Sequence, residues 1–262
     1  MARVFERFVA LGDSTTEGLD DPDGTGGYRG WANRLAEIIA AQQGRLRYAN
    51  LAVRGRRAFE IRAEQLERAV ALAPDLATVV AGTNDVLRPR FDAEGVGAEI
   101  GAMQHALLQG GATVLTFTLP DLSRVIPAGR LLAVRVRALN DALRAVSRES
   151  GAVLVDVASY DVASDPRLWS RDRLHANSHG HERIAAALAH ALELPGSDRS
   201  WADPLAAEYE SPFLERLVED MAWGREHLLP WVARRARGTS TGHGRRCKHP
   251  EFISLPAIDS AS

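Results

Sequence analysis

The sequence alternates between short apolar runs and longer amphipathic stretches, and this alternation limits the fold more than any other feature. The apolar runs are rich in β-branched residues and have the length of buried strands; they lie at 8–11, 46–51, 76–81, 113–119 and 152–157. The amphipathic stretches have helical spacing; they lie at 31–41, 58–72, 98–108, 131–147 and 178–192. Because parallel neighbours in a sheet need a crossover, the alternation predicts an α/β fold with a mostly parallel sheet covered on both faces.

A small hydroxyl residue stands where the first predicted strand ends. Gly12, Asp13 and Ser14 follow that strand directly, and sheets of this kind bind ligands at the carboxyl ends of their strands. Ser14 is therefore well placed to be a nucleophile. The same residue types are common in turns and at helix N-termini, so position alone leaves both interpretations open.

A carboxylate and an imidazole near the last predicted helix favour the nucleophile. Asp172 precedes His175 by three residues, which lets the carboxylate reach the imidazole within one turn. A serine hydroxyl is inert at neutral pH unless a base takes its proton, and a carboxylate improves that base by fixing its tautomer. Ser14, His175 and Asp172 together form a candidate triad.

Two residues at the ends of the second and third strands are candidate donors to an oxyanion, which acyl transfer needs. Gly55 has no side chain to keep a substrate from its backbone N–H. Asn84 carries an amide that can donate from the end of the third strand. Both residues are also ordinary loop, turn or cap residues.

These blocks resemble the SGNH (GDSL-type) hydrolases in order and spacing: Gly12-Asp13-Ser14, then Gly55, then Gly82-Thr83-Asn84-Asp85, then Asp172-x-x-His175. The resemblance covers residues 8–192 and implies a three-layer α/β/α sandwich with a five-stranded parallel sheet, of flavodoxin-like type. It also implies a hydrolase without a metal or an organic cofactor. One departure is Thr15, where the family usually has leucine after the Gly-Asp-Ser triplet.

The resemblance further implies a role for each matching residue. Ser14 would be the nucleophile, His175 the general base and acid, and Asp172 the residue that orients His175. The backbone N–H groups of Ser14 and Gly55 and the side chain of Asn84 would form the oxyanion hole.

Residue usage excludes several other chemistries. Lys248 is the only lysine among the 32 basic residues, so a phosphate-loop NTPase, a kinase and a pyridoxal-phosphate enzyme lack their lysine in the body of the fold. Cys247 is the only cysteine, which excludes an internal disulfide and a cysteine-ligated zinc cluster.

The net charge of −2 gives no reason to expect a nucleic-acid partner. No run of 18 apolar residues and no signal-peptide pattern occurs, so we expect a cytoplasmic protein without a membrane span.

Composition divides the chain into three parts. Residues 1–195 form the predicted catalytic domain, and residues 196–235 a helical extension that packs on it, with an aromatic-rich amphipathic helix from Phe213 to Trp231. Residues 236–262 form a basic tail that we expect to be a flexible end.

Several weaker signals receive ordinary interpretations. Ser240 lies in Gly238-Thr239-Ser240-Thr241-Gly242, which matches the G-x-S-x-G elbow but lacks its strand and helix. Neither His175, His179 and His181 nor the tail set His243, Cys247 and His249 has a familiar zinc spacing. We expect surface positions for His105 and His190. Six arginines fall in the ligand-side loops, as an ordinary solvated surface or as a positive field that attracts an anionic ester; they are Arg54, Arg56, Arg57, Arg88, Arg90 and Arg124.

The leading interpretation is a serine hydrolase that cleaves a small carboxylic ester, with a lipid or anionic ester included, through an acyl-enzyme. A thioesterase or a carbohydrate O-acetylesterase would use the same residues. A flavodoxin-like module that binds phosphate or flavin at Ser14, Thr15 and Thr16 is an alternative, but it gives no role to Asn84 or to the Asp172/His175 pair. A hydrolase fold with a non-catalytic or regulated role, acting through the tail and the helix around Trp223 and Trp231, is a third.

Overall fold

The structure is a computed structural model. It describes residues 4–121, 123, 125–126, 129–207, 213–230, 242 and 244–256. Arg124, Trp231, Ser240 and His243 lie outside the described residues, so the predictions made for them stay predictions.

In the part of the chain that the structure describes, six strands form one sheet in the order β5-β4-β3-β1-β2-β6. They are β1 (Arg7–Gly12), β2 (Arg45–Asn50), β3 (Leu76–Val80), β4 (Thr113–Phe117), β5 (Val153–Val155) and β6 (His249–Pro256). The first five are parallel, while β6 runs antiparallel to β2. The strand order reverses between β1 and β3, and the crevice at such a switch point is where doubly wound sheets bind ligands.

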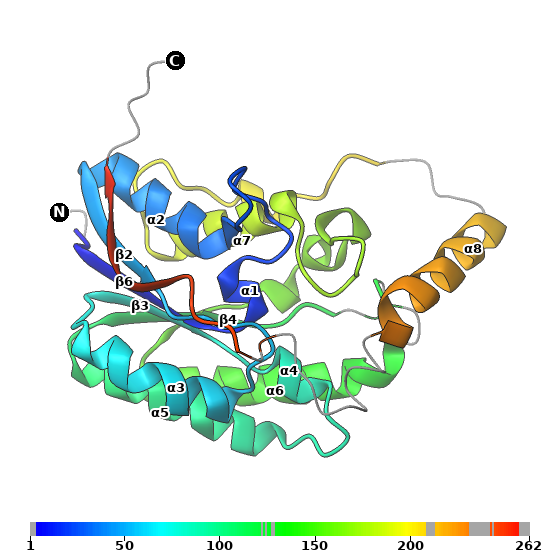
Figure 1. The fold of residues 1–262 in the computed structure, drawn as a ribbon, viewed down its shortest axis with the longest axis horizontal. Helices are drawn as coiled ribbons and strands as arrows, with labels where there is room; N and C mark the ends of the chain where they lie inside the picture. The colour runs from blue at the N-terminus through cyan, green and yellow to red at the C-terminus, as the bar shows by residue number, and fades with distance from the viewer. Residues whose placement is uncertain are drawn as a thin grey trace.

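Helices cover both faces of the sheet (Figure 1). On one face lie α2 (Gly30–Gln43) and α7 (Ser178–Ala191); on the other lie α3 (Ala58–Ala71), α5 (Ala93–Gln109) and α6 (Arg130–Ser150). Successive side chains of a strand point to opposite faces. In β1, Phe8 and Ala10 accordingly pack into the core beneath α2 and α7, while Val9 and Leu11 pack into the core beneath α3, α5 and α6.

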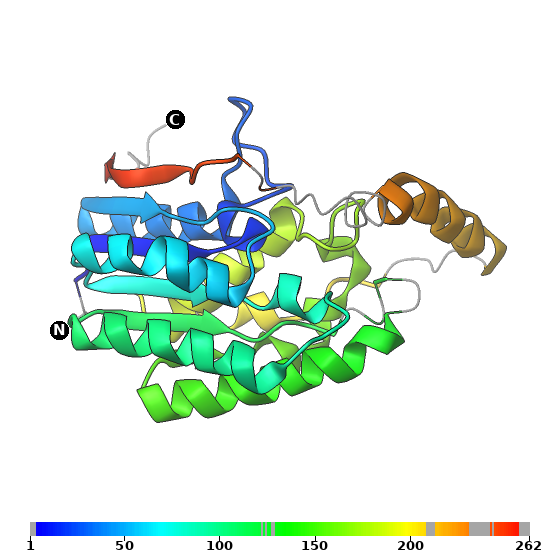
Figure 2. The ribbon, with the colours of Figure 1, turned by 60° about the horizontal axis from the view of Figure 1, so that its bottom comes forward.

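Short elements connect these layers at the carboxyl ends of the strands. α1 (Ser14–Glu17) follows β1, and α4 (Thr83–Val86) follows β3. The connection from β5 to α7 contains the 3₁₀ turns η2 (Val157–Ser159), η3 (Asp161–Ser164) and η4 (Pro166–Leu168), and η5 (Ser200–Ala202) follows α7. α8 (Phe213–Trp223) continues into the π-helical turn η6 (Gly224–Leu228) and extends away from the sheet (Figure 2).

The sheet differs from the expectation of five parallel strands, because β6 adds a sixth, antiparallel strand beside β2. This strand lies in the basic segment that we expected to be a flexible end. Its backbone pairs along β2, from Arg45 opposite Pro256 to Asn50 opposite His249. The prediction failed because an edge strand is specified by the free edge of its neighbour as well as by its own sequence.

Among the described residues, no helix is long and apolar enough to cross a membrane.

Candidate active site

Ser14 lies at the switch point of the sheet, as the first residue of α1. Asp13 caps this turn, because its carboxylate accepts the backbone N–H of Thr15 at 3.0 Å. Gly12 allows the tight exit from β1: a Cβ there would lie 2.3 Å from Thr16 Oγ1 and 2.8 Å from the Val80 carbonyl oxygen. Only glycine fits that close approach.

Ser14, His175 and Asp172 form a continuous chain of hydrogen bonds. His175 Nε2 lies 2.8 Å from Ser14 Oγ, and His175 Nδ1 lies 2.6 Å from Asp172 Oδ2. The other carboxylate oxygen, Asp172 Oδ1, accepts the Ser170 hydroxyl at 2.6 Å and the backbone N–H groups of Leu174 and His175 at 2.9 and 3.0 Å. With Nδ1 protonated toward the carboxylate, Nε2 is free to accept the serine proton.

The pKa shifts of Asp172 and His175 suit an orienting carboxylate and a general base. Burial alone would raise the pKa of Asp172, but the hydrogen bond and charge of His175 outweigh it and hold that pKa well below its ordinary value. Burial would lower the pKa of His175, yet the pKa is raised because Asp172 bonds to the ring and the charges of Asp20 and Asp13 add to the effect. A base with a raised pKa has more driving force to remove a serine proton.

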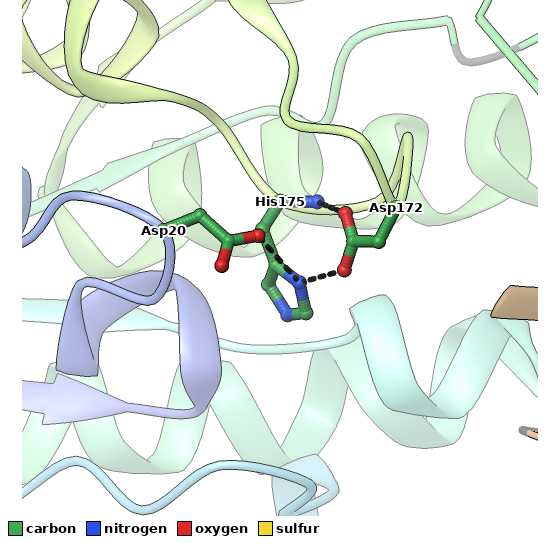
Figure 3. Close-up of side chains that lie close together, drawn as sticks. All are labelled: Asp20, Asp172 and His175. Carbon is green, nitrogen blue, oxygen red and sulfur yellow. Dashed lines mark hydrogen bonds and ion pairs between the residues drawn. The ribbon is translucent and has the colours of Figure 1, made fainter. Parts of the chain in front are cut away.

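A second carboxylate, Asp20, faces the same ring nitrogen, and no motif in the sequence indicated it. Its Oδ2 lies 3.9 Å from His175 Nδ1, on the opposite side from Asp172 (Figure 3). Asp20 has a left-handed backbone with φ of 66°, a conformation that Asp tolerates better than most residues. The loop between α1 and α2 therefore brings a further negative charge to the candidate base.

Asp20, Asp172 and His175 have ligand atoms within 4.8 Å of one another, which is a spacing that could hold a metal ion. Yet Nδ1 and Asp172 Oδ2 are 2.6 Å apart, whereas two ligands about 2.0–2.1 Å from a tetrahedral zinc lie about 3.3 Å apart. The Nδ1 proton also occupies the position that an ion would take. These atoms are arranged as a hydrogen-bonded pair and not as metal ligands.

The two candidate oxyanion donors lie in the Gly55 turn and in α4, and Asn84 bonds to the residue that precedes Ser14. Gly55 has φ of 79°, a left-handed conformation that favours glycine. Asn84, in α4, donates its side-chain amide to Asp13 Oδ2 at 2.9 Å and to the Arg56 carbonyl at 3.1 Å. Both amide protons are therefore engaged, and Asn84 ties the end of β3 to the Ser14 turn and the Gly55 loop.

Two buried carboxylates lie beside this amide. Burial raises the pKa of Asp13. Burial also raises the pKa of Asp85 to about 6, although its carboxylate accepts the Ala58 backbone N–H at 3.0 Å. Their roles are structural: Asp13 caps α1 and Asp85 caps the start of α3.

An apolar cavity of about 80 Å³ lies next to the candidate triad. Thr15, Thr83 and Leu174 line it, and each is the chain neighbour of a candidate site residue: Ser14, Asn84 and His175. The rest of the lining is almost wholly apolar; it includes Phe117, Leu119, Val162, Ala163, Ile184 and Trp201. Such a lining suits a hydrocarbon chain.

The loop arginines are largely paired with glutamates. Arg54 pairs with Glu17, Arg56 with Glu64 and Arg57 with Glu60. Arg57, Arg88 and Arg90 line a second, open hollow of about 660 Å³, where three carboxylates balance them: Asp85, Asp92 and Glu99. The charge expected to attract anionic esters is thus mostly neutralised within these loops.

The other histidines have packing or surface roles. His181 is buried, accepts the Trp31 backbone N–H at Nδ1 and donates from Nε2 to the Leu19 carbonyl. Burial lowers its pKa to about 4, so the ring is neutral. His179 is exposed beside Glu182. In the described part of the tail, Cys247 packs against the core and His249 lies edge-on to Tyr48.

α8 contacts the loop that carries the candidate acid and base. The Trp223 indole N–H donates to the Asp172 carbonyl at 2.9 Å, and Arg173 forms an ion pair with Asp220. Arg173 also lies over the Trp223 ring. The sequence indicated an aromatic helix here but not the partner of its indole.

A doubly wound parallel sheet with a Ser–His–Asp chain at its switch point is the arrangement of SGNH-type ester hydrolases. Comparison with known proteins agrees: residues 10–183 match the GDSL-like lipase/acylhydrolase family, and the chain belongs to this family. It is 30% identical to GDSL lipase Rv0518 of Mycobacterium tuberculosis over 198 residues, which cover 71% of this chain and 81% of that protein.

Solved structures support the fold. Axe2, an acetylxylan esterase from Geobacillus stearothermophilus, superposes with a TM-score of 0.61 at 17% identity, over 76% of this chain and 96% of that one. TesA superposes with a TM-score of 0.60 at 20% identity, over 72% and 98%. The fold predicted from the sequence is confirmed, apart from the sixth strand.

Proposed function

We propose that this protein hydrolyses carboxylic esters through an acyl-enzyme on Ser14. The observation that carries the proposal is the hydrogen-bonded chain from Ser14 Oγ through His175 to Asp172. Nε2 takes the serine proton as Oγ attacks the ester carbonyl, and the imidazolium that forms is stabilised by Asp172. Nε2 then returns the proton to the departing alcohol.

Deacylation uses the same groups in reverse order. A water molecule donates a proton to His175 Nε2 and attacks the acyl carbon, and the ester bond to Ser14 Oγ breaks as the serine regains its proton. The products are a carboxylic acid and the free enzyme, so neither an oxidant nor a cofactor is required.

The negative charge on the carbonyl oxygen is assigned to three donors: the backbone N–H groups of Ser14 and Gly55 and the side-chain amide of Asn84. Asn84 then shifts one amide proton from the Arg56 carbonyl, its longer contact at 3.1 Å, to the oxyanion. A donor that improves its contact only in the transition state contributes to rate and not to substrate binding.

The apolar cavity beside the triad supports an acyl chain of short to medium length. At about 10–15 Å³ for each water-sized group, 80 Å³ accommodates a chain of about five to eight carbons. An acetylated carbohydrate would leave most of this cavity empty, and a palmitoyl chain would exceed it.

Initial rates on p-nitrophenyl esters from acetate to palmitate test the proposal, with the wild type and Ser14→Ala compared on each ester. We expect the highest kcat/KM between pentanoate and octanoate and background rates for Ser14→Ala. Equal rates for the two proteins would overturn the serine mechanism. A maximum at acetate would instead support an O-acetylesterase, and a preference for the matching acyl thioesters would support a thioesterase.

A further inference from the structure

Lys248, the only lysine of the chain, reaches from the start of β6 to the loop that follows the nucleophile. Its Nζ donates to three backbone carbonyls, those of Glu17 at 3.2 Å, Tyr28 at 2.6 Å and Arg29 at 2.9 Å. An ammonium group has three N–H donors, so all of them are used. No step of the proposed reaction uses Lys248 or these three carbonyls.

The three carbonyls stand at the two ends of one loop. Glu17 is the last residue of α1, and Tyr28 and Arg29 directly precede α2. The two ends already touch, since a Cβ on Gly18 would lie 2.6 Å from Gly30 Cα. Lys248 bonds to both sides of this closure and so fixes the base of the loop that carries Asp20 to the candidate base.

Glu17, whose carbonyl Lys248 binds, also connects this loop closure to the Gly55 loop. The Glu17 carboxylate accepts the Arg54 backbone N–H at 2.9 Å and pairs with the Arg54 guanidinium. Gly242 packs on this loop from the C-terminal side, where a Cβ would lie 2.0 Å from the Arg54 carbonyl oxygen. The C-terminal segment thus contacts the chain on both sides of the proposed oxyanion hole.

We propose that Lys248 is a positioning residue, which holds the Ser14 turn and the Gly55 loop in register so that their backbone N–H groups converge on the oxyanion. The proposal rests on the proposed esterase function. It makes the C-terminal segment part of the catalytic architecture, although that segment follows the family's matched region, which ends at residue 183.

The protonation state of Lys248 gives a second test of the positioning role. Burial lowers the pKa of Lys248 to about 8, against the opposing charges of Glu17, Asp23, Asp21 and Glu37. The charge of Lys248 also acts on its chain neighbour His249, the first residue of β6; burial lowers the pKa of that imidazole, so it is uncharged at this pH. Above about pH 8 the neutral amine has two N–H groups for three carbonyls, and kcat of the wild type should fall.

The test compares Lys248→Met with Arg68→Met. Methionine keeps the length of the side chain but removes the donors. Arg68, in α3, also anchors β6, through the Pro250 carbonyl at 2.8 Å and the Glu251 carboxylate, but it does not touch the loop after Ser14. It is therefore a matched control for the attachment of the strand.

We expect kcat of Lys248→Met on the best p-nitrophenyl ester to fall about 10- to 100-fold, the range that a misplacement of about 1 Å produces, with KM changed less than twofold. Arg68→Met should keep the wild-type kcat, and the fall in kcat above pH 8 should be absent from Lys248→Met. Equal kcat losses in both variants, or unchanged kcat in Lys248→Met, would overturn the positioning role.

Hydrogen exchange separates this proposal from the esterase proposal. Lys248→Met should speed amide exchange in peptides that contain residues 14–30 and 54–56, and Arg68→Met should not. If the wild type hydrolyses no ester, the proposed function fails, and this exchange result still decides the matter: unchanged exchange in Lys248→Met would overturn the positioning role by itself.

Discussion

Asp20 provides a quantitative test of the electrostatics at the candidate base. Its carboxylate is 3.9 Å from His175 Nδ1 and its side chain is 38% exposed, so we use the aqueous value of Coulomb's law, which is the lower bound for this pair. Two unit charges at about 4 Å then attract by about 1 kcal/mol. Asp20→Asn removes this attraction with little change in shape.

One interaction energy of about 1 kcal/mol has two observable consequences. The pKa of His175 should fall by about 0.7, since 1.36 kcal/mol corresponds to a pKa difference of one. The imidazolium of the transition state should lose the same stabilisation, which lowers the plateau of kcat/KM about fivefold. The acidic limb of the pH profile therefore moves to lower pH while its plateau drops.

The assay is the pH dependence of kcat/KM between pH 4.5 and 8, fitted for the wild type, Asp20→Asn and Glu182→Gln. Glu182 is an exposed carboxylate on α7 beside His179, so its variant controls for the loss of a surface charge. An unchanged or raised pKa of His175 in Asp20→Asn, or the same shift in both variants, would show that the charge of Asp20 does not stabilise the imidazolium.

Three further predictions follow from contacts around the site. Trp223→Phe removes the N–H bonded to the Asp172 carbonyl. We expect steady-state kinetics to show a kcat about 2- to 10-fold lower with KM unchanged, as for the loss of one hydrogen bond of about 0.5–1.5 kcal/mol. An unchanged kcat would contradict a positioning role for α8. Ala163→Leu fills the apolar cavity. The acyl chain of the preferred p-nitrophenyl ester should become shorter by two or more carbons. An unchanged dependence of the rate on chain length would place the acyl group elsewhere. His181 has its pKa lowered to about 4, so between pH 6.5 and 4 the unfolded chain takes up a proton that the native state does not. About 3 kcal/mol of the free energy of unfolding is lost as the pH falls through this window. Urea unfolding should show a shallower pH dependence in His181→Gln, and identical slopes would argue against a neutral buried ring.

The regular elements were predictable because their periodicity is strong. The expected helix 58–72 is observed at Ala58–Ala71, and the expected strand 113–119 at Thr113–Phe117. The helix expected at 98–108 begins five residues earlier, at Ala93. Gly95 and Gly97 lower the helix propensity of that first turn, and the Asp92 cap that stabilises it, by accepting the Gly95 N–H, adds no apolar periodicity.

Side chains that meet the site from distant segments were not predictable. β6 contains Pro250 and ends with Pro256; proline is unusual in strands, but an edge strand tolerates it because one side of its backbone needs no partner. Asp20 and Lys248 lie in polar segments without a motif, and only the closure of the loop after α1 gives them their contacts. The Ser14, Asp172 and His175 chain was predictable because Ser14 falls at a strand end and Asp172 and His175 stand three residues apart just ahead of a predicted helix.

Covalent trapping tests whether Ser14 is the nucleophile. The protein is incubated with diethyl p-nitrophenyl phosphate, and its intact mass, its peptide map and its residual esterase activity are measured together. We expect one diethylphosphoryl group for each chain, located on Ser14, with activity lost in proportion and no adduct on Ser14→Ala. An adduct at another residue, or full activity after complete modification of Ser14, would contradict that role of Ser14.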